Sequence, residues 1–497
     1  MNDIDKVNEF EHGIGNGSEI NKDHLSFSVA SNIHYRYSSA KELLAKPEDL
    51  ASMIKHHREY QVPRLSVLDD YYKAKNTSII QNRRRKELNK ADHRAAHNFG
   101  KVLTQFDVGY NTGNPIKVEV KDNDIQQQTI DNFNIINDID EINSELWTDV
   151  DKYGRAYEIQ IRSQDDEDRI FLSNVFETFI VYDTTIERKP ILAVRYFRSG
   201  FDNDEVEFNT IAYSKDKIIE YQKTSFNAIE LKVEKETPHS YKEVQITEHS
   251  SNRFRQGLYE DILPLIDLYD SAQSDSANYM TDLNDALLVI SGDVEAAGIT
   301  TDDMIKQKDA NMLILESGTD FNGNKTSVQA NYIYKQYDVA GSEAYKQRVR
   351  RDLHAIASVP DLTDENFSGT QSGEAMKYKL FGFEQMTATK QRMFKKGLMK
   401  RYRLLFNLKS GIQELDNADL SDIRIMFTPN LPKAISAELE MLIKAGTEFS
   451  QETLLNLASF VDSAKLEQER VKAEQPKEEL YDFQTTATET TNQIVGE

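Results

Sequence analysis

The chain has 497 residues, a formal net charge of -23 at pH 7 and no cysteine, which excludes disulfides and thiolate metal sites. An acidic pI near 5.0 argues against a tight general nucleic-acid binder, whose affinity comes from Lys and Arg on phosphates. The length predicts about three structural units. No apolar run approaches the roughly 18 residues of a membrane span, and the N-terminus shows no secretion signal, so we expect a protein that stays in the cytoplasm.

Residues 1–40 are polar and are predicted to form a flexible tail. Their glycine-rich stretch follows no apolar strand and lacks the lysine of a phosphate loop. Apolar spacing between Ala40 and Asp70 predicts two short helices that end before Pro63. A further helix carries residues 98–106.

His93 and His97 are four residues apart, which on a helix would place both rings on one face. The glutamate of the His-Glu-x-x-His zinc motif is missing, and no third ligand is obvious. We therefore favour a packing or surface role over a metal site.

The next segments alternate helix and strand signals. One helix is predicted from Ile130 to Trp147. Residues rich in β-branched and aromatic side chains then predict strands, and we interpret this part as one mixed α+β unit. The expected strands are 157–161, 171–172, 178–182, 192–197, 205–213 and 217–222.

A helix is predicted from Tyr259 to about Leu288, with no Lys or Arg and with six acids placed against its apolar stripe. These acids would make one helix face strongly negative, which is typical of a solvated surface. They are Glu260, Asp261, Asp267, Asp270, Asp275 and Asp282.

Short apolar runs and polar turns follow between Val289 and Ala330. Gly318 to Thr326 resembles a Walker A loop with one residue too many, so nucleotide binding is not expected. A helix is then predicted from Tyr332 to Ser358. Its C-terminal half carries cations that offset the helix dipole or, alternatively, contact DNA phosphates; they are Lys346, Arg348, Arg350 and Arg351.

Pro360 ends this helix and begins a polar segment, Asp361 to Ser372, before a very long helix to Asn407. That helix would be about 50 Å long, and Gly382 and Gly397 could bend it. A basic run on it has no acid among its members. The run comprises Lys390, Arg392, Lys395, Lys396, Lys400, Arg401 and Arg403.

The C-terminal part begins with a predicted strand, Ile423 to Phe427. Two helices are expected at about 435–445 and 451–461. The remainder, from Lys465 to Glu497, is polar and is predicted to be partly disordered.

The run from Ser358 to Asn407 resembles the tunnel loop and long helix of tailed-phage portal proteins of the SPP1 type. It contains the loop Pro-Asp-Leu-Thr-Asp-Glu-Asn-Phe and the continuation Ser-Gly-Glu-Ala-Met-Lys-Tyr-Lys-Leu-Phe-Gly-Phe-Glu. The resemblance extends through most of the chain. It implies a twelvefold ring at one capsid vertex, through which a terminase motor packages double-stranded DNA and DNA is later ejected.

The resemblance also implies the fold class: α+β, with a mixed α/β wing, a two-helix stem, a small α/β clip, a long bent helix after a tunnel loop and a helical crown. The acidic helix would then lie near a pore or a neighbouring subunit. The basic run on the long helix would lie in the wing and contact neighbouring subunits. The boundaries that it suggests are a tail at 1–40, wing at 41–258, stem helices at 259–288 and 331–358, clip at 289–330, tunnel loop at 359–372, long helix and return to the wing at 373–433, crown at 434–464 and tail at 465–497.

The polar loop is the expected DNA-facing constriction. A strongly basic tunnel would hold DNA, whereas an acidic wall with scattered cations and a polar loop would grip it weakly. The expected constriction comprises Asp361, Leu362, Thr363, Asp364, Glu365, Asn366, Phe367 and Ser368.

The implied partners are further copies of the chain, double-stranded DNA without sequence preference, the terminase large subunit, head-completion proteins, and the major capsid and scaffolding proteins. Neither a cofactor, a metal nor a catalytic residue is expected. One alternative is a metal-dependent nuclease or phosphotransferase that uses Asp361, Asp364 and Glu365, although acids in one loop are more often turn residues. A second alternative is a structural head-tail adaptor without a DNA channel.

Overall fold

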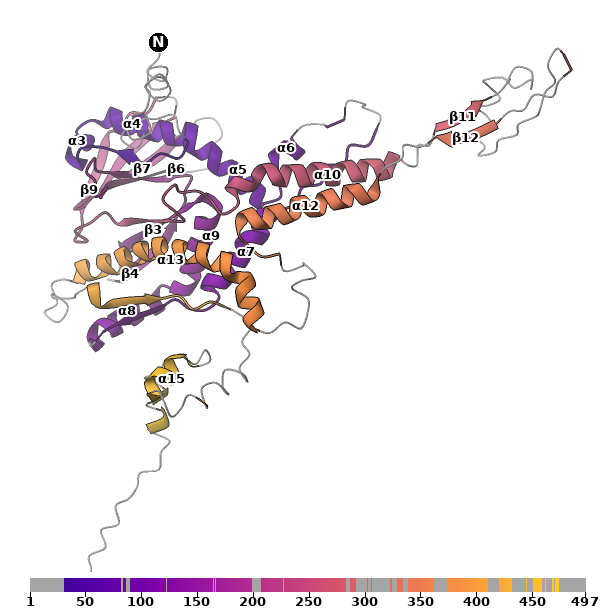
Figure 1. The fold of residues 1–497 in the computed structure, drawn as a ribbon. Helices are drawn as coiled ribbons and strands as arrows, with labels where there is room; N and C mark the ends of the chain where they lie inside the picture. The colour runs from indigo at the N-terminus through magenta and orange to yellow at the C-terminus, as the bar shows by residue number, and fades with distance from the viewer. Residues whose placement is uncertain are drawn as a thin grey trace, which may run out of the picture. The chain divides into compact units, whose positions relative to one another are not determined.

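The computed structural model divides into two compact units, residues 1–430 and 431–497 (Figure 1). In the first unit the described residues are 31–81, 84–85, 90–121, 123–163, 165, 167–198, 207–226, 228–282, 287–291, 302, 305, 322–323, 329–333, 338–361, 373–409 and 420–430. In the second unit they are 444, 450–457, 461, 467–468 and 470–472.

Ordered structure begins before residue 40, so the predicted tail boundary is wrong. Strand β1, Tyr35–Arg36, pairs in parallel with β5, Thr178–Tyr182, and Tyr35 is only 1% exposed. The Asn32 side chain also donates hydrogen bonds to the carbonyls of Phe254 and Arg255. These partners are more than 140 residues away, which is why local polarity alone missed the boundary.

The expected helix break at Pro63 is also wrong. Helices α3, Ala40–Leu44, and α4, Pro47–His56, are followed by one π-helical turn, His57–Gln61, and directly by α5, Val62–Tyr72. The π turn widens the helix, and Pro63 then lies in the first turn of α5, where its missing N–H is tolerated.

The single helix predicted from Ile130 to Trp147 is two helices, α8, Asp124–Ile136, and α9, Ile139–Tyr153. They are separated at Asp138, whose φ of +46° interrupts the right-handed helix. The preceding helices are α6, Thr77–Ile80, and α7, Phe99–Thr112.

The described residues form four sheets, three of which contain the predicted strands, and they confirm a mixed α/β fold. The largest has the order β1-β5-β6-β7-β8-β9, a second has the order β10-β3-β4, and two pairs are β13-β2 and β11-β12. Further bounds are β2 Lys117–Val120, β3 Arg155–Arg162, β4 Asp168–Ser173, β6 Pro190–Arg198, β7 Glu207–Tyr213, β8 Lys217–Ser225, β9 Val233–Pro238, β10 Ile246–Ser250 and β13 Ile423–Met426.

Two apolar cores hold these elements together. In one, α3 and α4 pack on the six-stranded sheet through residues such as Leu50, Ile54 and Val194. In the other, the long helix α13, Gly373–Lys409, packs on α8, α9 and β13 around Trp147 and Phe394. Burial of large side chains at roughly 25 cal/mol per Å² of apolar area makes these cores the main source of stability.

Among the described residues, helices α10 and α12 and a strand pair lie between the sheets and α13 in the sequence. After the short 3-10 helix Glu260–Ile262, α10 spans Leu263–Asp282, and α12 spans Val339–Ala357. Strands β11, Leu287–Ser291, and β12, Gln329–Ile333, pair antiparallel.

One helix is predicted to end at Leu288 and the next to begin at Tyr332. Both predictions are too long at these ends, because Leu288 and Tyr332 pair with each other across β11 and β12. That pairing joins positions 44 residues apart and leaves no local signal. Most of the Walker-like segment and most of the predicted clip lie outside the described residues.

The long helix is confirmed, and its 37 residues correspond to about 55 Å. Of its two glycines, Gly382 has open space where a side chain would be. At Gly397 an added Cβ would lie 2.3 Å from His249 Nδ1, so this glycine permits close contact with β10.

In the second unit α15 spans Gln451–Leu457, within one of the predicted helices. The other predicted C-terminal helix and most of the tail lie outside the described residues. Within the part of the chain that the structure describes, none of the helices is both long enough and apolar enough to cross a membrane.

Candidate functional site

Helices α10 and α12 lie side by side in opposite directions (Figure 1), and α12 ends just before the predicted tunnel loop in the sequence. Polar contacts join them along their length: Lys346 Nζ donates to Gln273 Oε1 at 3.0 Å, and the Ser276 and Ser342 hydroxyls are 3.4 Å apart. This hairpin and the segment between α12 and α13 contain the candidate channel residues.

The acids of α10 do not form a free negative face, which corrects the prediction. Asp270 is fully buried and accepts hydrogen bonds from the His97 backbone N–H at 3.0 Å and from His97 Nδ1 at 2.6 Å. Asp267 accepts from the Tyr71 hydroxyl at 2.6 Å. Asp270 thus holds the segment before α7 against α10, and Asp267 holds α5 against it.

Two more of the predicted acids also have partners within the chain. Glu260 binds Arg64 through two hydrogen bonds, of which Nε–Oε1 is 2.7 Å, and Asp275 lies 3.2 Å from Arg84. Asp261 is exposed, and the side chain of Asp282 lies outside the described part. The partners come from residues 64–97, so α10 binds the N-terminal helices by charge as well as by apolar packing.

The two histidines that raised the question of a metal precede α7 and are not helical, contrary to the spacing argument. The His93 backbone N–H donates to Asn278 Oδ1 at 2.7 Å, and His93 Nε2 lies 2.8 Å from Thr281 Oγ1. His97 binds Asp270. Both rings therefore lie along α10, and no cluster of three potential metal ligands occurs among the described residues.

Three of the four candidate cations for DNA contact bind anionic or polar groups of the same chain. Lys346 is 6% exposed and binds Gln273 and Glu343, and Arg348 binds Asp352 on the next turn. Arg350 binds Asp361. Arg351 is exposed, and it has no ion pair among the residues that the structure describes.

A short set of contacts fixes the point where the loop leaves α12. The helix is capped by Ser358 with a φ of +55°, and Val359 is buried. Arg350 binds both carboxylate oxygens of Asp361, at 2.9 and 2.8 Å. His354 Nδ1 donates to the Val359 carbonyl at 3.1 Å.

These contacts form what we call the loop-base clamp, Arg350, His354 and Asp361. Because His354 Nδ1 donates, the Nε2 atom, 3.9 Å from Asp361, carries a proton only in the imidazolium form. The remaining predicted constriction residues, Leu362 to Ser368, lie outside the described residues, as do Asp364 and Glu365 of the nuclease alternative.

Part of the basic run on α13 binds groups of the same chain, which corrects the expectation of subunit contacts for those cations. Lys390 is buried and its ammonium binds the carboxylates of Asp107 on α7 and Asp151 on α9. Trp147 Nε1 donates to the same Asp107 at 3.1 Å. Burial and the adjacent Asp107 raise the pKa of Asp151, and a proton held there would leave the cluster with no net charge.

A second buried ion pair lies further along α13. Arg401 is fully buried and donates to Glu158 at 2.9 Å and to Asn143 at 2.8 Å. Burial would raise the pKa of Glu158, but Arg401 and His249 more than offset this effect and lower it to about 2.

Two further cations of the run also bind within the chain. Lys400 is buried and donates to the Ile246 carbonyl at 2.7 Å, and Arg403 lies 2.7 Å from Glu243. One sequence signal could have revealed a buried charge: Asp107 lies between Leu103 and Tyr110 at helical spacing, on the apolar face of α7.

A family model and one relative among known proteins both indicate a phage portal protein. The family model described as "Phage portal protein, SPP1 Gp6-like" matches residues 51–479. The portal protein of Clostridium phage phiCD119 is 20% identical over 429 residues, which cover 82% of this chain and 91% of that protein. A solved structure titled "Neck of empty GTA particle computed with C6 symmetry" has 12% identity and a TM-score of 0.40, over 72% of this chain and 88% of the other.

Proposed function

Because the chain belongs to the SPP1-type family of phage portal proteins, we propose that it forms the channel through which double-stranded DNA enters a capsid and later leaves it. Membership of this family implies a homo-oligomeric ring associated with a phage capsid, and a structural rather than enzymatic role. The nuclease alternative and the adaptor without a channel are therefore set aside.

The observation that carries this proposal is the order of elements α10, β11-β12, α12, loop base and α13, within a match that spans residues 51–479. In our proposal α10 and α12 are the stem, the β11-β12 segment belongs to the clip, and the sheets with α13 form the wing. The clip would dock the terminase large subunit and later the head-completion proteins. Residues 434–464 would form the crown.

We propose that the segment Asp361 to Ser372 lines the constriction of the channel. Duplex DNA carries one negative charge per about 1.7 Å of axis, so a channel lined by many free cations would hold it strongly. The pairing of Lys346, Arg348 and Arg350 removes most of that attraction near the loop. Arg351 remains as the cation best suited to touch a passing phosphate.

A DNA-packaging assay with purified procapsids and the cognate terminase tests this function. Removal of Thr363 to Asn366 should leave rings and procapsids intact but reduce the amount of nuclease-protected DNA. Arg351→Glu should lower packaging less, and Arg392→Glu, an exposed cation of α13, serves as the matched control. Full packaging by the loop deletion would refute the assigned constriction.

The remaining partners follow from the same proposal. We expect a dodecamer in the capsid, assembled in the host bacterial cytoplasm with major capsid and scaffolding proteins. DNA would be contacted without sequence preference, since the proposed contacts reach the phosphate backbone.

A further inference from the structure

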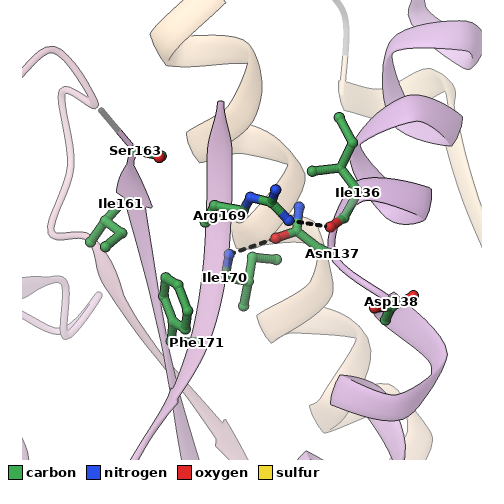
Figure 2. Close-up of a pocket in the computed structure, with 8 residues that line it drawn as sticks. All are labelled: Ile136, Asn137, Asp138, Ile161, Ser163, Arg169, Ile170 and Phe171. Carbon is green, nitrogen blue, oxygen red and sulfur yellow. Dashed lines mark hydrogen bonds between the residues drawn. The ribbon is translucent and has the colours of Figure 1, made fainter. Parts of the chain in front are cut away.

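A pocket of about 450 Å³ lies between the turn that joins α8 to α9 and the hairpin of β3 and β4 (Figure 2). We call it the α8–α9 pocket. None of the proposed channel residues contributes to it. Its lining comprises Ile136, Asn137, Asp138, Ile161, Ser163, Arg169, Ile170 and Phe171.

The walls of the pocket are fixed by buried polar contacts. Asn137 is 7% exposed; its Nδ2 donates to the Asp168 carbonyl at 3.0 Å, and its Oδ1 accepts from the Ile170 N–H at 2.8 Å. Arg169 donates to the Ile136 carbonyl at 2.5 Å (Figure 2). The helix turn and edge strand β4 are thus held together, which fixes the shape of the pocket.

Large apolar side chains are exposed at this pocket. Phe171 is 51% exposed and Ile136 is 39% exposed, and the adjacent Ile135 is 75% exposed. Single exposed apolar residues are common, but three around a preformed pocket are typical of a surface that another molecule covers. A volume of this size accommodates one or two apolar side chains of a partner.

The charge beside the pocket is negative. Asp138, Asp140 and Glu141 are exposed on the turn and the first turn of α9, and none has a basic partner among the described residues. The one cation of the lining, Arg169, is already paired with Glu167 at 2.6 Å. This charge disfavours nucleic acid and favours a segment that carries Lys or Arg.

We propose that the α8–α9 pocket is a docking site for another protein, which inserts an apolar side chain flanked by Lys or Arg. The apolar side chain contacts Phe171 and Ile136, and the flanking cations lie near Asp138 and Asp140. This surface is additional to the proposed channel, since it uses neither the α10–α12 hairpin nor the loop base.

Selection of peptides on the full-length protein tests the proposal. A displayed library of random dodecapeptides is the probe. We expect enriched sequences to place an aromatic or aliphatic residue between basic residues. Their binding to Phe171→Asp should be at least tenfold weaker, whereas Phe254→Asp, the same change at a residue 67% exposed elsewhere, should leave it unchanged.

A second variant tests the charge without altering the apolar wall. Asp138→Asn combined with Asp140→Asn keeps a residue type that tolerates the positive φ of position 138. We expect binding to weaken several-fold and its salt dependence to decrease. Circular dichroism and size-exclusion chromatography check that all variants fold and assemble as the wild type.

Several outcomes would overturn the proposal. They are the absence of any enriched peptide, enrichment of acidic peptides, and equal binding to Phe171→Asp and wild type. A structure of the assembled protein in which a neighbouring copy fills the pocket would also overturn it, because the occupant would then be this chain itself.

Discussion

The contact between α13 and the sheets differs from the α10–α12 hairpin in where its charges lie. On α13, Lys390 and Arg401 are buried and bind carboxylates of α7, α9 and β3. At the end of α12, Arg350 is 37% exposed and binds Asp361 at the surface. Removal of one partner of a buried pair leaves an uncompensated charge, whereas surface pairs contribute little.

This difference separates a rigid attachment from an adjustable one. The buried pairs hold α13 against the sheets in one register. A shift by one helical turn would leave both cations in an apolar core without their carboxylate partners. The loop-base clamp can open at a small energetic cost. A channel protein whose loop responds to passing DNA would use such a combination, a fixed wing and a movable loop base.

The largest expected effect is at Lys390. Lys390→Met leaves Asp107 and Asp151 buried without a cation and should lower the free energy of unfolding by about 3–5 kcal/mol. Denaturant unfolding at fixed protein concentration measures it. Arg392→Met, at an exposed position on the same helix, is the control and should change stability by less than about 0.5 kcal/mol. Equal effects would show that the buried cluster is not stabilising.

Low pH should destabilise the contact between α13 and the sheets. The folded-state pKa of Glu158 is lowered to about 2, below its ordinary value of 4.5, so its contribution is present above pH 4.5 and is lost as the pH falls toward 2. That contribution is on the order of 3 kcal/mol. Glu158→Gln should be less stable at pH 7 but should lose less stability between pH 4.5 and 3. An equally steep loss in both proteins would exclude Glu158 as the cause.

A pair of glycine substitutions compares two sites of α13. Gly397→Ala places Cβ against the His249 ring and should destabilise by about 1–3 kcal/mol. Gly382→Ala meets nothing within 4 Å and should stabilise by up to about 1 kcal/mol. Thermal unfolding of the two variants should therefore shift in opposite directions. Matching shifts would contradict the close approach of α13 to β10.

The smallest effect is expected at the loop base. Arg350→Ala should reduce global stability by less than about 1 kcal/mol, because the Arg350–Asp361 pair is partly exposed. Hydrogen exchange of the Val359 amide should nevertheless become faster, since the clamp holds that segment. Arg348→Ala, which removes a pair within α12, should leave this exchange rate unchanged. Unchanged exchange in Arg350→Ala would rule out a clamp.

The helices and strands with strong periodicity could be predicted from the sequence. The long helix and the strand at residue 423 are confirmed by α13 and β13, because their side-chain spacing is a local property. The break at Asp138 and the pairing of Leu288 with Tyr332 could not be predicted, since each depends on tertiary contacts.

The site was harder to predict than the fold. The basic run on α13 was misassigned because the carboxylates that bind Lys390 and Arg401 lie more than 230 residues away in the sequence. A count of charged residues along the sequence treats such cations as surface groups. The acids of α10 were wrongly predicted to form a solvated negative face for the same reason, because Asp270 binds His97, which lies 173 residues earlier.

Electron microscopy of the purified protein, combined with mass measurement in solution, tests the proposed channel most directly. We expect rings with an open central bore lined by the loop that follows α12, and a mass equal to a whole number of protomers. A monomer at every concentration, or an assembly without a central opening, would contradict it.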